Sequence, residues 1–184
     1  MAKDNRLSGS PAEREPDDFG KYCRVIEDFP KPGVSFKDIT PLLLDGGAFH
    51  RAIQALSRPF SGKVDSIVCI EARGFLIGAP MAFYLNCGLI PIRKTGKLPG
   101  KTRSKTYDLE YGTDTLEIHA DAIKSGQRIL VVDDVLATGG TAKAAINLIR
   151  ELQGNVIGCA FLGVLTELNS INKLDVPVHS LIKF

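Results

Sequence analysis

Residues 130–152 constrain the fold more than any other part of the chain. They begin with the apolar run Leu130–Val132, which is typical of a parallel strand buried on both faces of a sheet. Two adjacent carboxylates, Asp133 and Asp134, follow this run, and we expect them at the carboxyl end of the strand, outside the sheet. Apolar residues then recur at helical spacing, at Ala142, Ala145, Ile146, Ile149 and Leu152. The segment therefore predicts a buried strand, a turn and a helix in succession.

The turn between that strand and that helix consists of small residues, namely Ala137, Thr138, Gly139, Gly140 and Thr141. Its two glycines allow backbone conformations that other residues avoid, so successive N–H groups can converge on one anion. The two threonine hydroxyls can donate as well. Because the N-terminus of a helix favours a phosphate, we predict a phosphate site here. The alternative is an ordinary surface turn in which Asp134 caps the helix.

The string VVDDVLATGGT lacks two common phosphate motifs and resembles a third. The chain contains neither G-x-x-x-x-G-K-[ST] nor the dinucleotide motif G-x-G-x-x-G. The string resembles the phosphoribosyl-pyrophosphate (PRPP) signature of type I phosphoribosyltransferases. This resemblance implies that residues 137–141 hold the 5-phosphate of PRPP and that Asp133 and Asp134 face the ribose hydroxyls.

Four further segments resemble the adenine phosphoribosyltransferases of that family and occur in the same order. They are FPKPGVSFKDITPLL (29–43), EARGF (71–75), IRKTGKLPG (92–100) and YDLEYG (107–112). The resemblance covers roughly residues 22–184. It implies an enzyme that makes AMP and pyrophosphate from adenine and PRPP, acts as a homodimer, and uses Mg²⁺ held mainly by PRPP rather than by an assigned protein ligand.

The remaining pattern predicts one α/β domain with a parallel sheet flanked by helices, as in type I phosphoribosyltransferases, with a small N-terminal hood and a β-ribbon lid. Strands are expected at 64–70, 89–92, 129–132 and 156–165, alternating with helices at 49–60, 75–86 and 141–153. A short amphipathic helix is expected over residues 22–29. Residues 1–17 are charged and poor in apolar side chains, which predicts a disordered extension to a single domain at 18–184.

Composition narrows the partners and the compartment. The net charge of +2 argues against a bulk polyanion as partner, so we expect no nucleic-acid partner. No apolar stretch is long enough to span a bilayer and no signal peptide is evident, so we expect no membrane association. The four cysteines lack C-x-x-C or zinc spacing, which favours reduced thiols in the cytosol. The three histidines, His50, His119 and His179, form no cluster in the sequence and are interpreted as structural.

The loop after the first core strand offers a candidate pyrophosphate contact. Arg73 can present a guanidinium fork to phosphate oxygens, and Gly74 lets the backbone approach. The alternative is an ion pair between Arg73 and Glu71 at the strand end. The family resemblance implies pyrophosphate binding by this loop and a cis peptide bond before Arg73.

Residues 93–105 carry six basic side chains and no acidic one. Glycines and a proline interrupt the run, which predicts a mobile loop, followed by two strands at 107–111 and 115–119 that form a lid. The resemblance implies pyrophosphate contacts from Arg93, Lys94, Lys97 and Tyr111, including contacts across a dimer interface. It also implies that Glu110 is the catalytic residue. No role is assigned to Lys101, Arg103 and Lys105.

The loop 32–39 is predicted to select the base. Adenine presents a donor beside an acceptor, so one backbone C=O and one N–H can recognise it. The resemblance implies the main chain of Ser35 and Lys37, with Phe36 and Leu165 packing on the ring. Residues 162–174 depart from the family pattern, which leaves open a phosphoribosyltransferase with another base preference. A PRPP-binding regulator without turnover is the non-enzymatic alternative; Glu110 and the basic loop favour catalysis, and no helix-turn-helix segment precedes the core.

Overall fold

The computed structural model describes residues 18–108 and 112–184, apart from the side chain of Asp108. The predicted extension 1–17 and the predicted site residues Glu110 and Tyr111 lie outside the described residues. The elements follow in the order 3-10 turn η1 (Phe19–Tyr22), β1 (Arg24–Ile26), β2 (Phe36–Asp38), α1 (Thr40–Leu44), α2 (Gly46–Ser57), 3-10 turn η2 (Arg58–Phe60), β3 (Ser66–Ile70), α3 (Arg73–Leu85), β4 (Gly88–Lys94), β5 (Thr102–Asp108), β6 (Thr113–His119), β7 (Arg128–Leu136), α4 (Gly140–Glu151), β8 (Asn155–Val164), the 3-10 turns η3 (Thr166–Leu168) and η4 (Ser170–Lys173), and β9 (Val178–Lys183).

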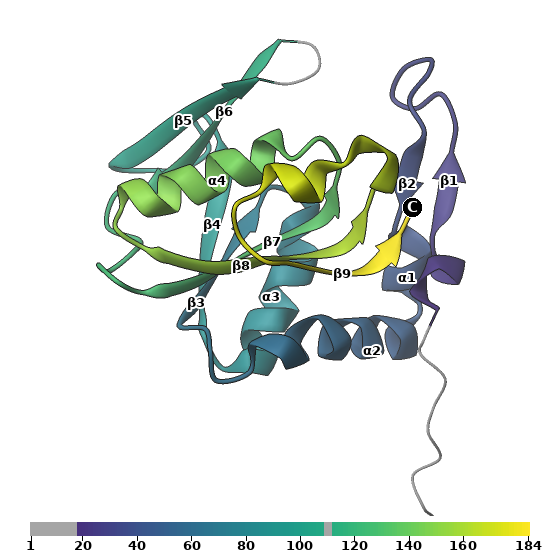
Figure 1. Cartoon of the computed structure of the whole chain (residues 1–184), viewed down its shortest axis with the longest axis horizontal. Helices are drawn as coiled ribbons and strands as arrows, with labels where there is room; N and C mark the ends of the chain where they lie inside the picture. Colours follow the sequence, from purple (N-terminus) through teal and green to yellow (C-terminus); the bar gives the residue numbers. More distant parts are fainter. Residues whose placement is uncertain (1–17, 109–111) are drawn as a thin grey trace, which may run out of the picture.

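A seven-stranded sheet in the order β5-β6-β4-β3-β7-β8-β9 forms the centre of the molecule (Figure 1). Strands β4, β3, β7, β8 and β9 pair in parallel, and β6 and β5 continue the sheet in antiparallel pairing. The predicted parallel sheet with intervening helices is confirmed. Its parallel strands end at one common edge, which is where ligands bind in such sheets.

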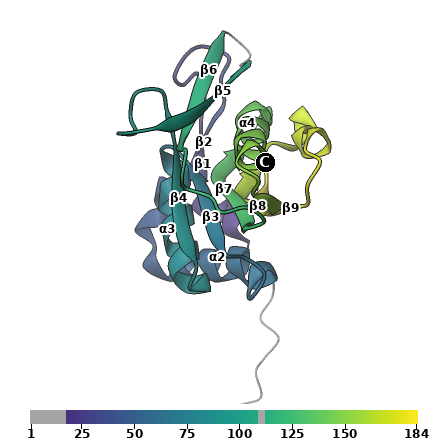
Figure 2. The same cartoon turned by 90° about the vertical axis from the view of Figure 1, so that its left-hand side faces the viewer.

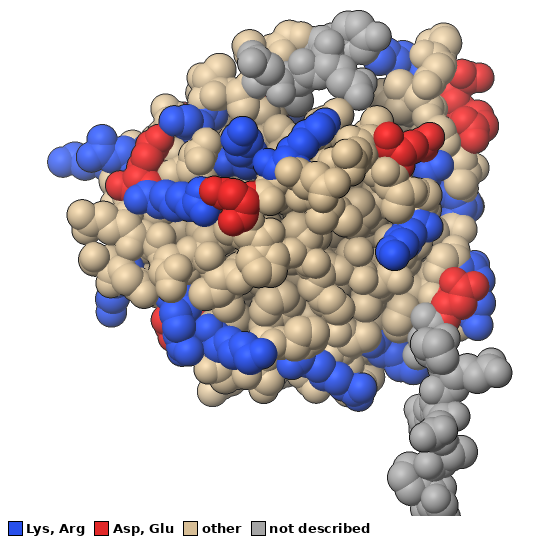
Figure 3. All heavy atoms as spheres, viewed as in Figure 1, with Lys and Arg blue, Asp and Glu red and all other residues tan. Residues whose placement is uncertain are grey.

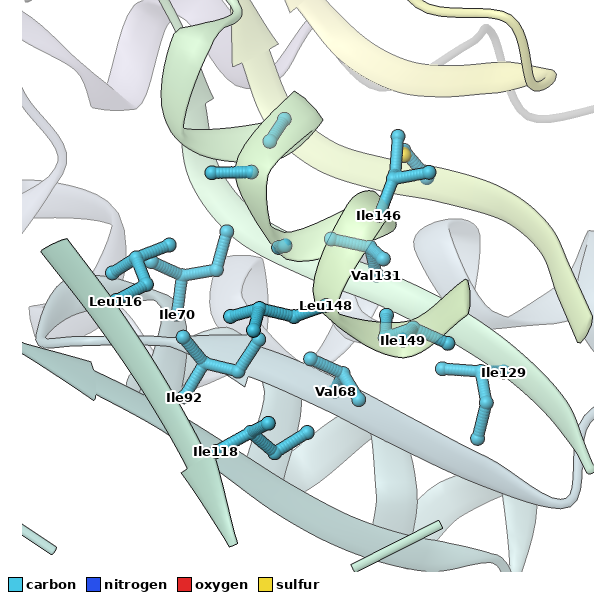
Figure 4. Packing of buried hydrophobic residues seen from close by; sticks show 14 of the residues in the cluster. Val68, Ile70, Ile92, Leu116, Ile118, Ile129, Val131, Ile146, Leu148 and Ile149 are labelled. Carbon is cyan, nitrogen blue, oxygen red and sulfur yellow. The ribbon is translucent and has the colours of Figure 1, made fainter. Parts of the chain in front are cut away.

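Helices cover both faces of this sheet, with α4 on one side and α3 on the other (Figure 2). The helix α4 buries Ile146, Leu148 and Ile149 against Val68 and Val131 (Figure 4). On the opposite face, α2 and α3 pack on a second cluster that includes Leu130 and Val132. The side chains of Leu130–Val132 are therefore buried on both faces, as their unbroken apolar run predicts.

The helix predicted over residues 22–29 is wrong. The chain forms the short strand β1 there, which pairs antiparallel with β2 and forms a separate two-stranded sheet. The apolar side chains of Val25 and Ile26 on β1, and of Phe29 after it, are exposed, so no core is available to stabilise an amphipathic helix. An ion pair of 2.6 Å from Arg24 to Asp38 joins the two strands instead. We refer to the two paired strands β1 and β2, with the loop between them, as the hood.

The basic segment 93–105 is only partly a loop. Strand β5 begins at Thr102, so Arg103 and Lys105 lie on a strand that pairs with β6 from Thr102↔His119 to Asp108↔Thr113. Threonine and serine alternate with longer side chains at 102–106, a pattern that suits a half-exposed edge strand. The basic residues in the same stretch led to the prediction of a loop instead. The hood and the β5–β6 ribbon both project beyond the upper edge of the sheet in Figure 1.

Candidate active site

The acidic pair lies within β7 rather than beyond it, which corrects the sequence prediction. Ladder pairing continues from Asp133↔Phe161 to Leu136↔Val164, because β8 extends as far as β7 does. Asp134 is only 4% exposed, and its backbone N–H donates to Oδ1 of Asp133 over 2.9 Å. Asp134 is thus buried near the carboxyl end of β7, whereas its neighbour Asp133 is half-buried.

Burial controls the charge of this pair. It raises the pKa of Asp133 well above the usual range for a carboxyl, and the charge of Asp134 raises it further. Burial also raises the pKa of Asp134, although the nearby Arg73 opposes this change. Oδ2 of Asp134 lies 2.8 Å from Nε of Arg73, yet it accepts no hydrogen bond from the described residues.

The small-residue turn leads into α4 as predicted. Gly139 is the N-cap residue with φ of +88°, a conformation that a side chain would strain. No side chain caps this helix, so the alternative in which Asp134 caps it is wrong. A small cavity of about 70 Å³ lies against the turn and is lined by Asp133, Val135, Leu136, Ala137, Thr138, Gly139, Thr141, Ala142 and Phe161. The free N–H groups and the helix dipole make this turn suitable for an anion.

Arg73, the first residue of α3, connects the acidic pair to the hood. Its guanidinium lies 4.7 Å from the ring centroid of Phe36, and its Nη1 donates to the carbonyl oxygen of Lys37 over 3.3 Å. Arg73 pairs with Asp134, so the predicted alternative of a pair with Glu71 is wrong. The cis bond joins Glu71 to Ala72, one peptide bond earlier than the resemblance implied.

The predicted basic residues divide into two groups. Lys94 pairs with Asp114 on the lid strand β6 over 2.9 Å, whereas Arg93 and Lys97 both bond to Glu71. A cavity of about 300 Å³ is lined by Ile70, Glu71, Ala72, Arg73, Lys94, Tyr107, Asp114, Leu116, Asp133, Asp134, Val135 and Thr141. Arg73 and Lys94 thus share one cavity with the acidic pair and the first turn of α4, while Arg93 and Lys97 bond to Glu71 and do not line this cavity.

The predicted base-recognition residues lie on the hood and after β8. Nζ of Lys37 donates to Oγ of Ser35 over 2.9 Å, and Phe36 and Lys37 both contact Arg73. Leu165 follows β8, and its N–H bonds to the carbonyl oxygen of Leu136 over 3.0 Å. The structure thus connects Ser35, Phe36 and Lys37 to the cavity through Arg73 and holds Leu165 beside the end of β7.

Sequence reasoning missed the contacts of three residues, Asp114 and Tyr107 at the cavity and Phe184 beside the hood. Asp114 binds Lys94, and the hydroxyl of Tyr107 accepts a hydrogen bond from Thr141 over 3.3 Å, which joins the lid to α4. The ring of Phe184 lies 5.9 Å from Nζ of Lys37, and its backbone N–H bonds to Val164 over 2.9 Å, next to Leu165. Only the pairing of β5 with β6 could have indicated Asp114, because Tyr107 and Asp114 are register partners.

The histidines and cysteines do not join this site. His50 contacts Gln54, His119 contacts the carbonyl oxygen of Pro99, and the ring of His179 packs edge-on against Phe60. All four cysteines are free thiols. Within 18–108 and 112–184, no group of three or more His, Cys, Asp or Glu residues could hold a metal by itself, and no helix is long and apolar enough to cross a membrane. Basic side chains are dispersed over the face shown in Figure 3, several beside acidic ones.

Comparison with known proteins identifies the class to which this fold and site correspond. Residues 14–166 match the family described as phosphoribosyl transferase domain, and the chain therefore belongs to that family. Its relatives include the adenine phosphoribosyltransferase of Desulfitobacterium hafniense (strain Y51), 57% identical over 169 residues that cover 91% of this chain and 98% of that protein. The adenine phosphoribosyltransferase of Methylobacterium nodulans (strain LMG 21967 / CNCM I-2342 / ORS 2060) is 53% identical, with coverage of 88% and 91%.

Solved structures agree with these relatives. Adenine phosphoribosyltransferase from Thermoanaerobacter pseudethanolicus superposes with a TM-score of 0.87 at 52% identity, covering 90% of this chain and 98% of that one. The Saccharomyces cerevisiae adenine phosphoribosyltransferase, complexed with an imino-altritol bisphosphate and adenine, superposes with a TM-score of 0.83 at 38% identity, covering 89% and 98%.

Proposed function

We propose that the protein is an adenine phosphoribosyltransferase, which transfers the phosphoribosyl group of PRPP to adenine and releases pyrophosphate to give AMP. The observation that carries this conclusion is the single cavity that joins the acidic pair, Arg73, Lys94 and the first turn of α4. A phosphorylated sugar that bears a pyrophosphate needs such an arrangement, in which cationic groups and helix N–H groups face its phosphates and carboxylates face its hydroxyls. Relatives that are more than 50% identical over most of the chain support adenine as the base.

The subsites for PRPP follow from this arrangement. The turn 137–141 binds the 5-phosphate through its free N–H groups. Asp133 and Asp134 accept hydrogen bonds from the ribose hydroxyls, and Arg73 and Lys94 bind the pyrophosphate oxygens. The sequence resemblance adds Arg93, Lys97 and Tyr111 to the pyrophosphate subsite.

The base lies between the hood and the end of β8 in this proposal. One N–H and one C=O from Ser35 and Lys37 pair with adenine, while Phe36 and Leu165 pack on its ring. The carbonyl oxygen of Lys37 already accepts from Arg73, and its second lone pair is available for the amino group of adenine.

Mg²⁺ fits the donor set of the site. The carboxylate oxygens of Asp133 and Asp134 are hard donors beside the proposed PRPP site, so a cation held there by PRPP would lower their raised pKa values, and Oδ2 of Asp134 accepts no hydrogen bond from the described residues. Bound together with PRPP, Mg²⁺ would neutralise charge on the pyrophosphate group. We assign it no direct protein ligand, because two carboxylates are fewer than a cage requires and PRPP supplies most oxygens.

Proton handling is assigned to the lid. Attack by a ring nitrogen of adenine on the anomeric carbon forms the new C–N bond and breaks the bond to pyrophosphate, and the base must then lose its proton. We propose Glu110 as the carboxylate that accepts this proton. Arg73, which is ion-paired with Asp134 and stacked on Phe36, orients the leaving group relative to the base.

We further propose a homodimer in the cytosol. The outer face of α3 exposes Phe83 at 90%, Leu76 at 49% and Tyr84 at 43%, an apolar surface suited to burial against a second copy. Unbonded cysteines are typical of a reducing compartment. We also propose that 18–184 is one domain preceded by the extension 1–17, since Phe19 packs in the same cluster as Leu130 and Ile182.

The proposed reaction is tested by pyrophosphate release from PRPP and Mg²⁺ with adenine, hypoxanthine, guanine or orotate supplied separately. The expected result is turnover with adenine alone. Turnover with another base would overturn the assigned specificity and point to the hood or to residues 162–174. Binding of PRPP without turnover of any base would instead support the regulator and remove Glu110 from its assigned role.

A further inference from the structure

The side chain of Glu71, directly after β3, is the centre of a cluster of polar contacts with the basic segment 93–97. Its side chain is 7% exposed and accepts hydrogen bonds from Nε and Nη2 of Arg93, each over 3.3 Å. It also accepts from the backbone N–H of Lys94 over 3.0 Å and from Nζ of Lys97. One carboxylate from the end of β3 therefore binds three residues of the neighbouring basic segment.

The contacts of Glu71 favour the charged form of its carboxyl group. Burial raises the pKa of Glu71, but the hydrogen bonds from Lys97, Lys94 and Arg93 outweigh burial and lower the pKa to about 2. A nearly buried charge that lost these donors would be strongly unfavourable, so the contacts are formed together. The carboxylate therefore fixes the segment as a unit.

The contacts define the shape of residues 93–97. Nη1 of Arg93 donates to the carbonyl oxygen of Lys97 over 3.1 Å, which closes the segment into a loop. Since the backbone rather than the side chain of Lys94 binds Glu71, Nζ of Lys94 is free to reach Asp114 and the cavity. Glu71 thus separates one cation that faces the cavity from two that do not.

We propose that Glu71 is a positioning residue for pyrophosphate, which acts by holding Arg93, Lys97 and the backbone of Lys94 in the arrangement that leaves Nζ of Lys94 facing the cavity where PRPP is proposed to bind. This inference rests on the proposed function. It assigns to a negative side chain a favourable effect on the binding of a negative ligand. The opposite role, in which Glu71 competes with pyrophosphate for the same cations, predicts the opposite change in affinity.

The first test replaces Glu71 by Gln. The amide retains the size of the side chain, but it carries no charge and its NH₂ group faces donors instead of accepting from them. The Kd of Mg²⁺-pyrophosphate, measured by calorimetry without turnover, is expected to rise about tenfold, as expected for the loss of hydrogen bonds to a charged group. The KM for PRPP should rise similarly, with the KM for adenine unchanged. The shorter carboxylate of Glu71→Asp should restore part of the affinity.

Asp65→Asn is the matched control. Asp65 precedes the other end of β3 and accepts from the side chain and the backbone N–H of Arg128, the same kind of contact outside the cavity. This variant should leave the Kd and both KM values unchanged. Thermal unfolding of all variants checks that the fold is intact.

The second test combines Glu71→Gln with Lys97→Gln. If Glu71 acts through Lys97, the double variant should bind pyrophosphate little more weakly than the Lys97→Gln variant does. Fully additive losses, unchanged affinity in Glu71→Gln, or tighter binding would each overturn the proposal. An inactive wild-type protein would overturn the proposed reaction, while the pyrophosphate affinities would still test Glu71.

Discussion

Asp133 illustrates how one residue can oppose stability while serving a site. Its pKa is raised in the folded protein by burial and by the adjacent Asp134, so the folded state retains the proton to a higher pH than the unfolded chain does. The favourable contribution of this proton is complete below the ordinary value of 3.8 and is lost as pH rises through the raised value. At neutral pH, where this carboxyl group is ionised in the unfolded chain, Asp133 therefore opposes folding.

Asp133→Asn should consequently unfold at a higher temperature at pH 7. The amide preserves the acceptor for the Asp134 N–H and cannot ionise, so we expect a gain of about 1 kcal/mol, or roughly 2–4 °C. The gain should shrink as the pH falls toward 4, and activity should fall at all pH values. Calorimetry between pH 4 and 8 measures this, with the exposed Asp121→Asn as the control. A gain that grows toward low pH would contradict the assignment.

Arg73 is the second residue whose chemistry can be isolated. Arg73→Lys retains the charge, but it lacks the planar group that stacks on Phe36 and reaches Lys37. We expect the KM for PRPP to rise roughly tenfold, with a smaller decrease in kcat. Steady-state kinetics measure both values, and Arg103→Lys on the exposed part of β5 is the control. An unchanged KM would remove Arg73 from the pyrophosphate subsite.

At the scale of elements, the close packing of α3 on β7 fixes the distance between the arginine and the acidic pair. A Cβ atom added at Gly74 would lie 2.8 Å from Oδ1 of Asp133 and 3.1 Å from the carbonyl oxygen of Val132. The helix can therefore approach the strand only because this position has no side chain. The first turn of α3 and the carboxyl end of β7 form one rigid unit as a result.

Gly74→Ala should therefore destabilise the protein by about 1–3 kcal/mol, because the strand backbone must move to accept the methyl group. The loss should appear in denaturant unfolding as a lower midpoint, and the KM for PRPP should rise with it. Gly46→Ala at the start of α2 is the control, since no atom lies within 4 Å of the added Cβ there. Equal stability of the two variants would show that α3 adapts without cost.

Elements with strong periodicity were predictable, and those stabilised by pairing were not. The core strands, α2, α3 and α4 follow from apolar patterns, because each buries a continuous face. Strand β1 was mistaken for a helix because Val25, Ile26 and Phe29 have helical spacing but remain exposed. Strand β9 was missed, although it completes the sheet beside β8 through the pairing Phe161↔Ser180. Its mixed segment of polar and apolar residues has no distinctive pattern.

The site was predictable where a motif joins a strand to a helix. The turn 137–141 and Arg73 lie where the sequence indicated, because the strand-end position determines both. The basic segment was predicted only by charge, which could not separate Lys94, in the cavity, from Arg93 and Lys97, bound to Glu71. Whether a basic side chain lines the cavity or bonds to Glu71 depends on its neighbours in the folded structure, which the sequence does not show.

At the scale of the whole molecule, the exposed face of α3 predicts assembly. Phe83→Glu introduces a charge into the apolar surface where the second copy is proposed to pack. We expect light scattering to show half the mass of the wild-type particle and activity to fall. Leu44→Glu on α1, an equally apolar side chain that is 81% exposed, is the control and should leave the dimer intact. A wild-type monomer would contradict the proposed assembly.

The position of Arg73 also bears on how such a chain can diverge. One side chain contacts Phe36 and Lys37 of the hood and Asp134 of the acidic pair. A mutation in the hood that altered the choice of base would therefore also disturb Arg73 and its proposed contact with the pyrophosphate of PRPP. Leu165 lies outside these contacts with Arg73, so a change there leaves the cation in place. Divergence toward a new base is expected to proceed through Leu165 and the rest of residues 162–174, with the hood conserved.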